Sequence, residues 1–65
     1  MKIQYYEETD TLHILLTTAP PVETRDLDED SFCDIDDRGK LVSITIERLR
    51  ERHGDPVVSY EKIPA

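Results

Sequence analysis

The chain has 65 residues, of which 37% are hydrophobic, 35% are charged and 6% are aromatic. A chain this short forms one small domain and is too small for most enzyme architectures. Domains of this size bury only about 60% of the surface that the unfolded chain exposes, so many of them need a disulfide, a metal or a partner chain. The single cysteine, Cys33, excludes an internal disulfide. We therefore expect self-association or a second protein to supply the missing stabilisation.

The net charge is −7, from fifteen acidic residues against eight lysines and arginines. This balance disfavours a broad positive field of the kind that attracts nucleic-acid phosphates or anionic lipids, and it suits a basic partner. The sequence shows no apolar stretch of signal-peptide length, and no run reaches the roughly 20 apolar residues of a membrane span. Together with the lone cysteine, these features predict a cytoplasmic protein without membrane contacts.

Between residues 2 and 47, apolar and polar residues alternate in short segments, as is typical of antiparallel strands. A polar connection over residues 7–10 separates the first two segments. Residues two apart share a face of a strand, so these two segments combine their large side chains into the first half of a core. The side chains expected on this face are Ile3, Tyr5, Leu12, Ile14 and Leu16.

Ala19, Pro20 and Pro21 end the second segment, because proline cannot donate to a strand ladder. The chain turns or crosses over at this point. Residues 22–27 alternate imperfectly, which indicates a half-exposed or edge strand. The acidic residues that follow predict a turn.

Two further strands are expected over residues 31–36 and 41–47, and Cys33 is predicted to face the core. The segment between them, residues 36–40, is the clearest turn in the chain, because aspartate favours the start of a type I turn and glycine supplies a positive φ. In the last strand we expect Val42, Ile44 and Ile46 to face inward, and Leu41, Ser43 and Thr45 to face outward.

Residues 47–53 are good helix formers and Gly54 ends the segment. Such a short helix is unstable alone, so we expect Ile46 and Leu49 to dock it on the sheet. Residues 55–65 form a further strand, pair with another chain or remain a loose tail. The predicted organisation is one domain over residues 1–52 and a tail or extra strand over residues 53–65. The predicted fold class is mainly β: a small antiparallel β-meander of four to five strands followed by a short C-terminal helix.

Several positions together resemble a widespread prokaryotic family of small proteins that is catalogued only as a domain of unknown function. The family pattern begins Met-Lys-Ile-x-Tyr-x-x-Glu-x-Asp-x-Leu-x-Ile and continues through an Asp-x-Asp-x-x-Gly hairpin to a Val/Ile-rich strand. The matching positions here, within residues 1–49, are Met1, Lys2, Ile3, Tyr5, Glu8, Asp10, Leu12, Ile14, Asp34, Ile35, Asp36, Gly39, Val42, Ile44 and Ile46.

This resemblance implies a small antiparallel meander with a short helix and no established biochemical activity. It also implies an antitoxin-like role, because members of the family often look like companions of small basic proteins suspected to be toxins. The chain has Ser43 and Thr45 where the family usually has glycine and an acidic residue, and His13 where an aromatic residue is common. We expect any interface formed by these three positions to differ from that of the family.

Asp34, Asp36 and Gly39 have the spacing of the first half of an EF-hand calcium loop. That loop also needs an oxygen ligand at its fifth position and a glutamate at its twelfth, with a helix on each side. Arg38 and Thr45 occupy those two positions, and the flanking segments are predicted strands. The pattern therefore favours a solvated hairpin turn.

His13, Cys33 and His53 are the only residues that suggest a transition-metal site or a Cys/His nucleophile. Their wide spacing supports neither, and nothing in the sequence places an orienting carboxylate or an oxyanion donor beside them. We therefore predict a protein that is not an enzyme, with no catalytic residue, no metal site and no cofactor.

Eight of the fifteen acidic residues lie within residues 23–37, opposed there only by Arg25. We call these eight residues the acidic band. Such a run is usually a solvated face, and its charge also protects strand edges from aggregation. The alternative is a docking surface for a basic protein, because complementary charge speeds encounter and suppresses wrong partners. The candidate partner-binding residues are Glu23, Asp26, Asp28, Glu29, Asp30, Asp34 and Asp36, with Asp37 completing the band.

Arg48, Arg50 and Arg52 form the only basic cluster, with Glu47 and Glu51 interleaved. The sequence thus predicts a small non-catalytic protein-interaction module that acts as a homo-oligomer, as an antitoxin-like partner of a small basic protein, or as both. The alternative is a dimeric, autoregulatory nucleic-acid-binding protein that uses the helix carrying these three arginines.

Overall fold

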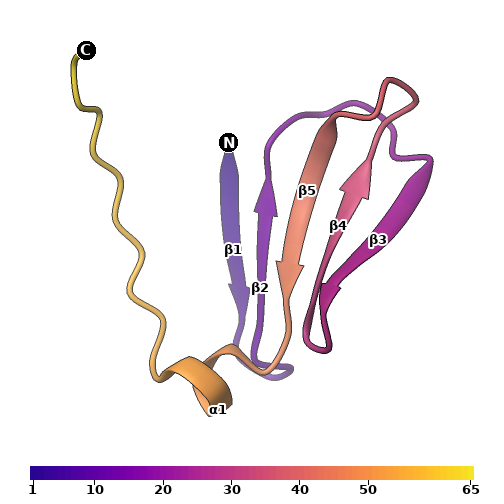
Figure 1. Cartoon of the computed structure of the whole chain (residues 1–65). Coiled ribbons are helices and arrows are strands. Elements are labelled where there is room, and N and C mark those ends of the chain that lie inside the picture. Colours follow the sequence, from indigo (N-terminus) through magenta and orange to yellow (C-terminus); the bar gives the residue numbers. More distant parts are fainter.

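The computed structural model describes residues 1–65 and consists of one five-stranded antiparallel sheet followed by one short helix (Figure 1). This architecture confirms the predicted fold class. The elements are β1 (Lys2–Tyr6), β2 (Thr11–Leu15), β3 (Glu23–Asp28), β4 (Ser31–Ile35), β5 (Leu41–Ile46) and α1 (Leu49–His53).

The spatial order of the strands is β1-β2-β5-β4-β3, which differs from the sequential order of a simple meander. The last strand, β5, lies between β2 and β4 and pairs with both. The segment that contains Pro20 and Pro21 passes from the end of β2 across to the far edge, where Val22 N donates to Ile35 O at 2.9 Å (Figure 1). The crossover allowed by the two prolines therefore occurs, and it leaves the central place in the sheet to β5.

The strand register gathers the large apolar side chains on one face. Ile3 lies opposite Ile14, and Ile14 lies opposite Ile44 on the other side. Two residues further along each strand, a second row crosses the same three strands and consists of Tyr5, Leu12 and Ile46. Paired residues of antiparallel strands point to the same side, so both rows share one face. We call this the apolar face, consisting of Ile3, Tyr5, Leu12, Ile14, Ile44 and Ile46.

The most buried part of the molecule surrounds β5. Cys33 and Ile35 on β4 and Val42 on β5 are almost fully buried, which confirms the inward position predicted for the cysteine. Ser43 and Thr45 alternate with Ile44, as predicted, but they are also buried, Ser43 to 3% exposure. β5 is the central strand, with β2 on one side and β4 on the other, and these neighbouring strands shield its small polar side chains from solvent.

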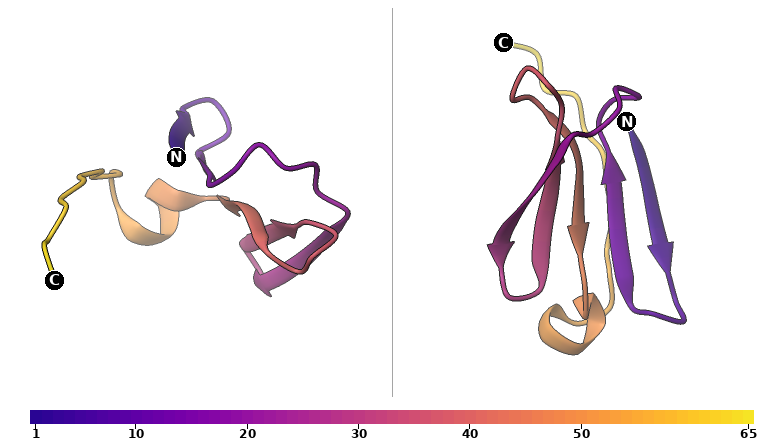
Figure 2. Two further views of the ribbon diagram at one scale, coloured as in Figure 1. Left: turned by 90° about the horizontal axis from the view of Figure 1, so that it is seen from above. Right: turned by 90° about the vertical axis from the view of Figure 1, so that its right-hand side faces the viewer.

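The helix lies at the end of the sheet where β5 ends (Figure 1). The helix α1 is five residues long, and the predicted docking residues Ile46 and Leu49 are both half-buried. The C-terminal tail, residues 55–65, forms no helix or strand. From α1 it turns back and extends past the level of the N-terminus without joining the sheet (Figure 1). In the view from above it lies on the opposite side of the strands from the β2–β3 crossover (Figure 2). No helix in the structure has the length and apolar character needed to cross a membrane.

The sheet lacks a second layer. The elements that contact each other extensively are the neighbouring strands within the sheet, and no element packs extensively across a face of the sheet. Small domains normally bury a sheet face against another element. Here only seven of the 65 residues are buried. The core of the single chain is therefore thin.

The thin core makes stability sensitive to single truncations at β4. We expect Ile35→Ala, at a side chain that is 4% exposed, to destabilise the fold by about 2–5 kcal/mol through lost burial and a residual cavity. The matched control is Leu27→Ala, at a side chain that is 59% exposed, and it should leave stability nearly unchanged. Urea denaturation followed by circular dichroism measures both, and equal midpoints for the two variants would contradict the assignment of the core.

Candidate interaction site

A buried carboxylate in the β3–β4 turn organises the acidic side of the molecule. Asp30 is 7% exposed, and its Oδ1 accepts a hydrogen bond from Arg48 Nε at 2.7 Å. Its Oδ2 pairs with Arg52 Nη1, which also lies 3.1 Å from Glu29 Oε1. The Asp30 carbonyl accepts a hydrogen bond from Glu47 N at 2.7 Å. These contacts form one ion-pair cluster, Asp30, Glu29, Arg48 and Arg52, which joins the β3–β4 turn to α1.

The cluster brings together two surfaces that the sequence presents as separate. Asp30 and Glu29 belong to the acidic band, whereas Arg48 and Arg52 belong to the basic cluster. Their charges offset each other inside the chain, and Arg50 is the only one of the three arginines whose guanidinium group forms no ion pair within 4.0 Å. The hypothesis of nucleic-acid binding through this helix remains untested, and two of the guanidinium groups that it needs are engaged in ion pairs.

The start of α1 is capped by a residue from the β1–β2 turn. Arg48 occupies the N-cap position with φ of 53° and provides no side-chain cap. Instead, the Asp10 carboxylate accepts hydrogen bonds from Arg50 N at 2.8 Å and Glu51 N at 3.1 Å, and the Asp10 carbonyl accepts one from Leu49 N at 3.0 Å. Carboxylates at the N-terminus of a helix satisfy its free N–H groups.

Tyr5 completes the Asp10 network from the apolar face of β1. Its hydroxyl donates to Asp10 Oδ1 at 2.5 Å. This hydrogen bond, followed by those from the backbone N–H groups of Arg50 and Glu51, holds the pKa of Asp10 below its ordinary value. The same hydrogen bond raises the pKa of Tyr5, because it favours the protonated phenol. The ionised carboxylate is thus the form that holds the helix.

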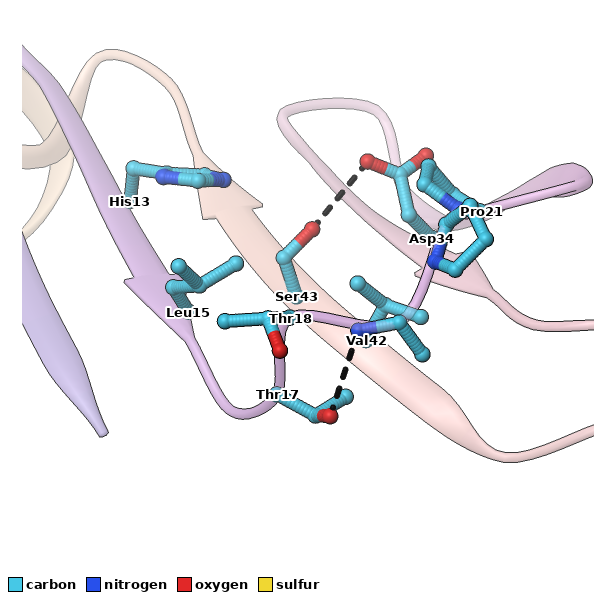
Figure 3. A pocket seen from close by; sticks show the side chains of 10 residues that line it. His13, Leu15, Thr17, Thr18, Pro21, Asp34, Val42 and Ser43 are labelled. Carbon is cyan, nitrogen blue, oxygen red and sulfur yellow. Dashed lines mark hydrogen bonds between the residues drawn. The ribbon is translucent and has the colours of Figure 1, made fainter.

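The polar face of the sheet carries an open hollow of about 440 Å³ beneath the β2–β3 crossover (Figure 3). Its floor includes His13, Asp34 and Ser43. Asp34 Oδ1 accepts a hydrogen bond from Thr24 Oγ1 at 2.6 Å, and Oδ2 accepts one from Ser43 Oγ at 3.1 Å. The carboxylate is therefore shared between two hydroxyl groups and does not orient His13. Its evident role is to tie β3, β4 and β5 together.

His13, Ser43 and Thr45 are neighbours in space. His13 pairs with Thr45 across β2 and β5, and Ser43 lies two residues along the same strand and face. His13 and Ser43 both line the hollow. Cys33 pairs with Ile44 and therefore points to the opposite face from His13. The one thiol and this imidazole consequently do not share a site.

The predicted turn after β4 is confirmed in detail. Asp36 Oδ1 accepts hydrogen bonds from Arg38 N and Lys40 N, both at 2.9 Å, and the Asp36 carbonyl accepts one from Gly39 N at 3.0 Å. Gly39 adopts φ of 78°, in the left-handed region that glycine favours. The side chain of Asp36 therefore stabilises the hairpin from within, as local Asp-to-backbone hydrogen bonds do in turns.

The remaining carboxylates of the acidic band have different surroundings. Glu23 pairs with Arg25 on the exposed edge strand β3, and this contact lowers the pKa of Glu23 and raises that of Arg25. Asp26 and Asp28 are exposed, and neither lies within 4.0 Å of a cationic side chain. Among the seven candidate partner-binding residues, these two are the carboxylates most available to a partner.

Asp10 and Tyr5 are the residues of the site that sequence reasoning missed. Both belong to the resemblance pattern, but nothing near them in the sequence marks a helix cap. The capped amides of Arg50 and Glu51 lie 40 and 41 residues away along the chain. Only the tertiary structure, which brings the β1–β2 turn next to the start of α1, reveals that Asp10 caps the helix.

The ion-pair cluster predicts unequal roles for two neighbouring carboxylates. Asp30→Asn should destabilise the fold by about 1–3 kcal/mol, less than for a fully buried pair because both arginines are partly exposed. Glu29→Gln, at a carboxylate that is 74% exposed, should change stability by less than about 0.5 kcal/mol. Urea unfolding at neutral pH compares the two variants, and a larger loss for Glu29→Gln would refute the central role of Asp30.

The Asp10 network predicts a specific acid sensitivity. Because the folded-state pKa of Asp10 lies below its unfolded-state value, the carboxylate stabilises the fold above the unfolded-state pKa of about 3.9. This contribution is lost as the pH falls through the folded-state pKa. Asp10→Asn should therefore be less stable than the wild type at neutral pH and approach it at about pH 2. Urea midpoints across this range measure the difference.

Two further results bear on the same network. Tyr5→Phe removes the leading cause of the lowered pKa and should shrink the pH-dependent difference attributed to Asp10. A constant difference between Asp10→Asn and the wild type at every pH would mean that the charge of Asp10 does not hold the helix.

Comparison with known proteins places this sheet and helix within a family. The family model that matches is described as "Protein of unknown function (DUF2283)", and it covers residues 2–50, which include all five strands and the start of α1. No curated protein and no solved structure matches the chain. The match extends over most of the sequence and agrees with the resemblance seen in its motifs. The chain therefore belongs to the DUF2283 family of proteins of unknown function.

Proposed function

We propose that the protein is a non-catalytic protein-interaction module that binds a small basic protein at the outer edge of β3, in the manner of an antitoxin. The proposal is supported by the position of this strand. β3 is the last strand in the sheet, all six of its residues are exposed, and only its inner edge is paired, with β4. An edge of this kind offers free backbone N–H and C=O groups to a strand from another chain.

The observation that carries the proposal is the arrangement of Asp26, Leu27 and Asp28. The register with β4 shifts between the two aspartates, so Leu27 is an additional residue in β3. Leu27 is 59% exposed and lies between two carboxylates that have no cationic partner within 4.0 Å. An apolar residue flanked by charges resembles the centre and rim of a protein interface.

The chemistry of this edge favours a basic partner. Lysine and arginine side chains would approach the free carboxylates of Asp26 and Asp28, while the strand backbone supplies affinity that does not depend on sequence. Neighbouring Glu29 and Asp30 are engaged with the arginines of α1, which keeps the β3–β4 turn in place beside this edge. The partner would thus meet a fixed surface.

The test compares two double variants with the same change in charge. Asp26→Asn/Asp28→Asn removes the proposed contacts, and the asparagine at position 28 can still accept the hydrogen bond from Asp30 N. Glu7→Gln/Glu8→Gln, in the exposed β1–β2 connection, is the matched control. The tagged wild type is used to capture its partner from the native lysate, and the partner is identified by mass spectrometry. Binding of the purified partner is then measured by calorimetry.

We expect the aspartate variant to bind about tenfold more weakly, because each exposed ion pair contributes up to about 1 kcal/mol. The control should bind like the wild type, and higher salt should weaken wild-type binding more than that of the aspartate variant. Equal affinity of the two variants for the partner, or a captured partner that is acidic, would contradict the proposed function.

A further inference from the structure

The apolar face is only partly covered within the chain. Ile3 is 41% exposed, while Tyr5, Ile14, Ile44 and Ile46 are half-buried. The row Tyr5, Leu12 and Ile46, called the lower row here, is partly shielded. At Leu12, a groove is lined by Leu49 of α1 and by Val57 and Val58 at the start of the tail. The upper row, Ile3, Ile14 and Ile44, contains the most exposed of the six side chains, Ile3.

The surface area of the chain exceeds that of a compact monomer of the same mass. The accessible surface is 5321 Å². A compact monomer of 7.5 kDa has an accessible surface of about 4,200 Å², so this chain carries an excess of about 1,100 Å². Each partner in a stable protein–protein complex buries about 800 Å². The excess, to which the exposed tail contributes, is comparable with the area of one interface per chain.

The shape of the chain agrees with its surface area. The radius of gyration is 13.0 Å. A compact domain of 65 residues has a radius of gyration of about 11 Å. Part of the difference comes from the tail, whose large apolar side chains Val57, Tyr60 and Ile63 are 91%, 79% and 78% exposed. The tail thus adds further apolar surface that its own chain leaves uncovered.

The charge distribution indicates what occupies the apolar face. Its six residues carry no charge, although the whole chain has a net charge of −7. A basic protein gains no electrostatic advantage there, whereas two copies of this chain can meet without opposing like charges. The nearest charged residue in the upper row is Arg25, which lies at the far edge beyond Ile44 and Cys33 and is paired with Glu23.

We infer that a second copy of this chain packs on the apolar face, so that the two sheets form a sandwich around a shared core. A twofold arrangement uses the same surface of both copies, and facing sheets pack about 10 Å apart. The tail of each copy lies along the open side of its partner, where Tyr60 and Ile63 become buried. The dimer supplies the second layer that the single chain lacks, and it leaves the outer edge of β3 free.

This inference is independent of the proposed function, because the two surfaces lie on different parts of the sheet. Failure to find a basic partner would leave the dimer intact, and a monomer would still present Asp26 and Asp28 at the β3 edge. The two proposals are therefore tested separately.

The first experiment is light scattering coupled to size-exclusion chromatography of the full chain at micromolar concentrations. We expect a dimer whose Tm rises with protein concentration. Ile3→Lys places a charge in the upper row at an edge-strand position and should convert the protein to a monomer. Leu27→Lys is the matched control, because it adds the same charge at an exposed leucine outside the interface and should remain dimeric.

A second measurement does not depend on a variant that folds. In a mixed sample of isotope-labelled and unlabelled wild-type chains, the methyl groups of Ile3, Ile14 and Ile44 should show intermolecular nuclear Overhauser effects.

Tyr60→Ser/Ile63→Ser should weaken the dimer at least several-fold if the tails cover the partner.

Three results would overturn the inference. They are a wild type that is monomeric at these concentrations, a dimer that persists in Ile3→Lys, and intermolecular effects confined to β3 or to the outer edge of β1. An unchanged dimer in the tail variant would exclude the tails from the interface and contradict that part of the inference.

Discussion

The structure depends on the insertion of β5 between β2 and β4. Without β5 the chain would contain two separate hairpins, β1–β2 and β3–β4. An isolated hairpin is at best marginally stable in water. β5 pairs with both hairpins and turns them into one sheet. It also carries three of the seven buried residues, Val42, Ser43 and Thr45. Since β5 is the last strand in the sequence, the complete sheet can form only after most of the chain is present.

Two carboxylates, Asp10 and Asp30, connect α1 to the turns at the end of the sheet from which it emerges. A five-residue helix is too short to be stable in isolation. Asp10 satisfies its free N–H groups from one turn, and Asp30 holds its arginines from another. Both turns lie beside the exit of β5, so the helix is built where the two hairpins meet. The acidic composition of the chain thus has a structural use that net charge alone conceals.

A single sheet of this size leaves two kinds of surface open, and their chemistry differs. The β3 edge exposes backbone groups and free carboxylates, whereas the apolar face exposes uncharged side chains across β1, β2 and β5. Surfaces of such different character suit different partners. A shared core between two copies and a separate edge for a basic protein are physically compatible, because the first uses a face of the sheet and the second uses its rim.

Local patterns in the sequence determined the strands, the Asp36–Gly39 turn and the short helix, because alternation, proline, glycine and helix propensity act within a few residues. They also determined which residues share a face, except at the start of β5, where the register with β4 shifts and Leu41 pairs with Ile35. Ser43 and Thr45 became buried once β5 was placed centrally. The strand order, the Asp10 cap and the Asp30 ion pairs were decided only by the tertiary structure. Each joins residues 18 to 41 positions apart or strands that are not consecutive, and no local pattern specifies such partners.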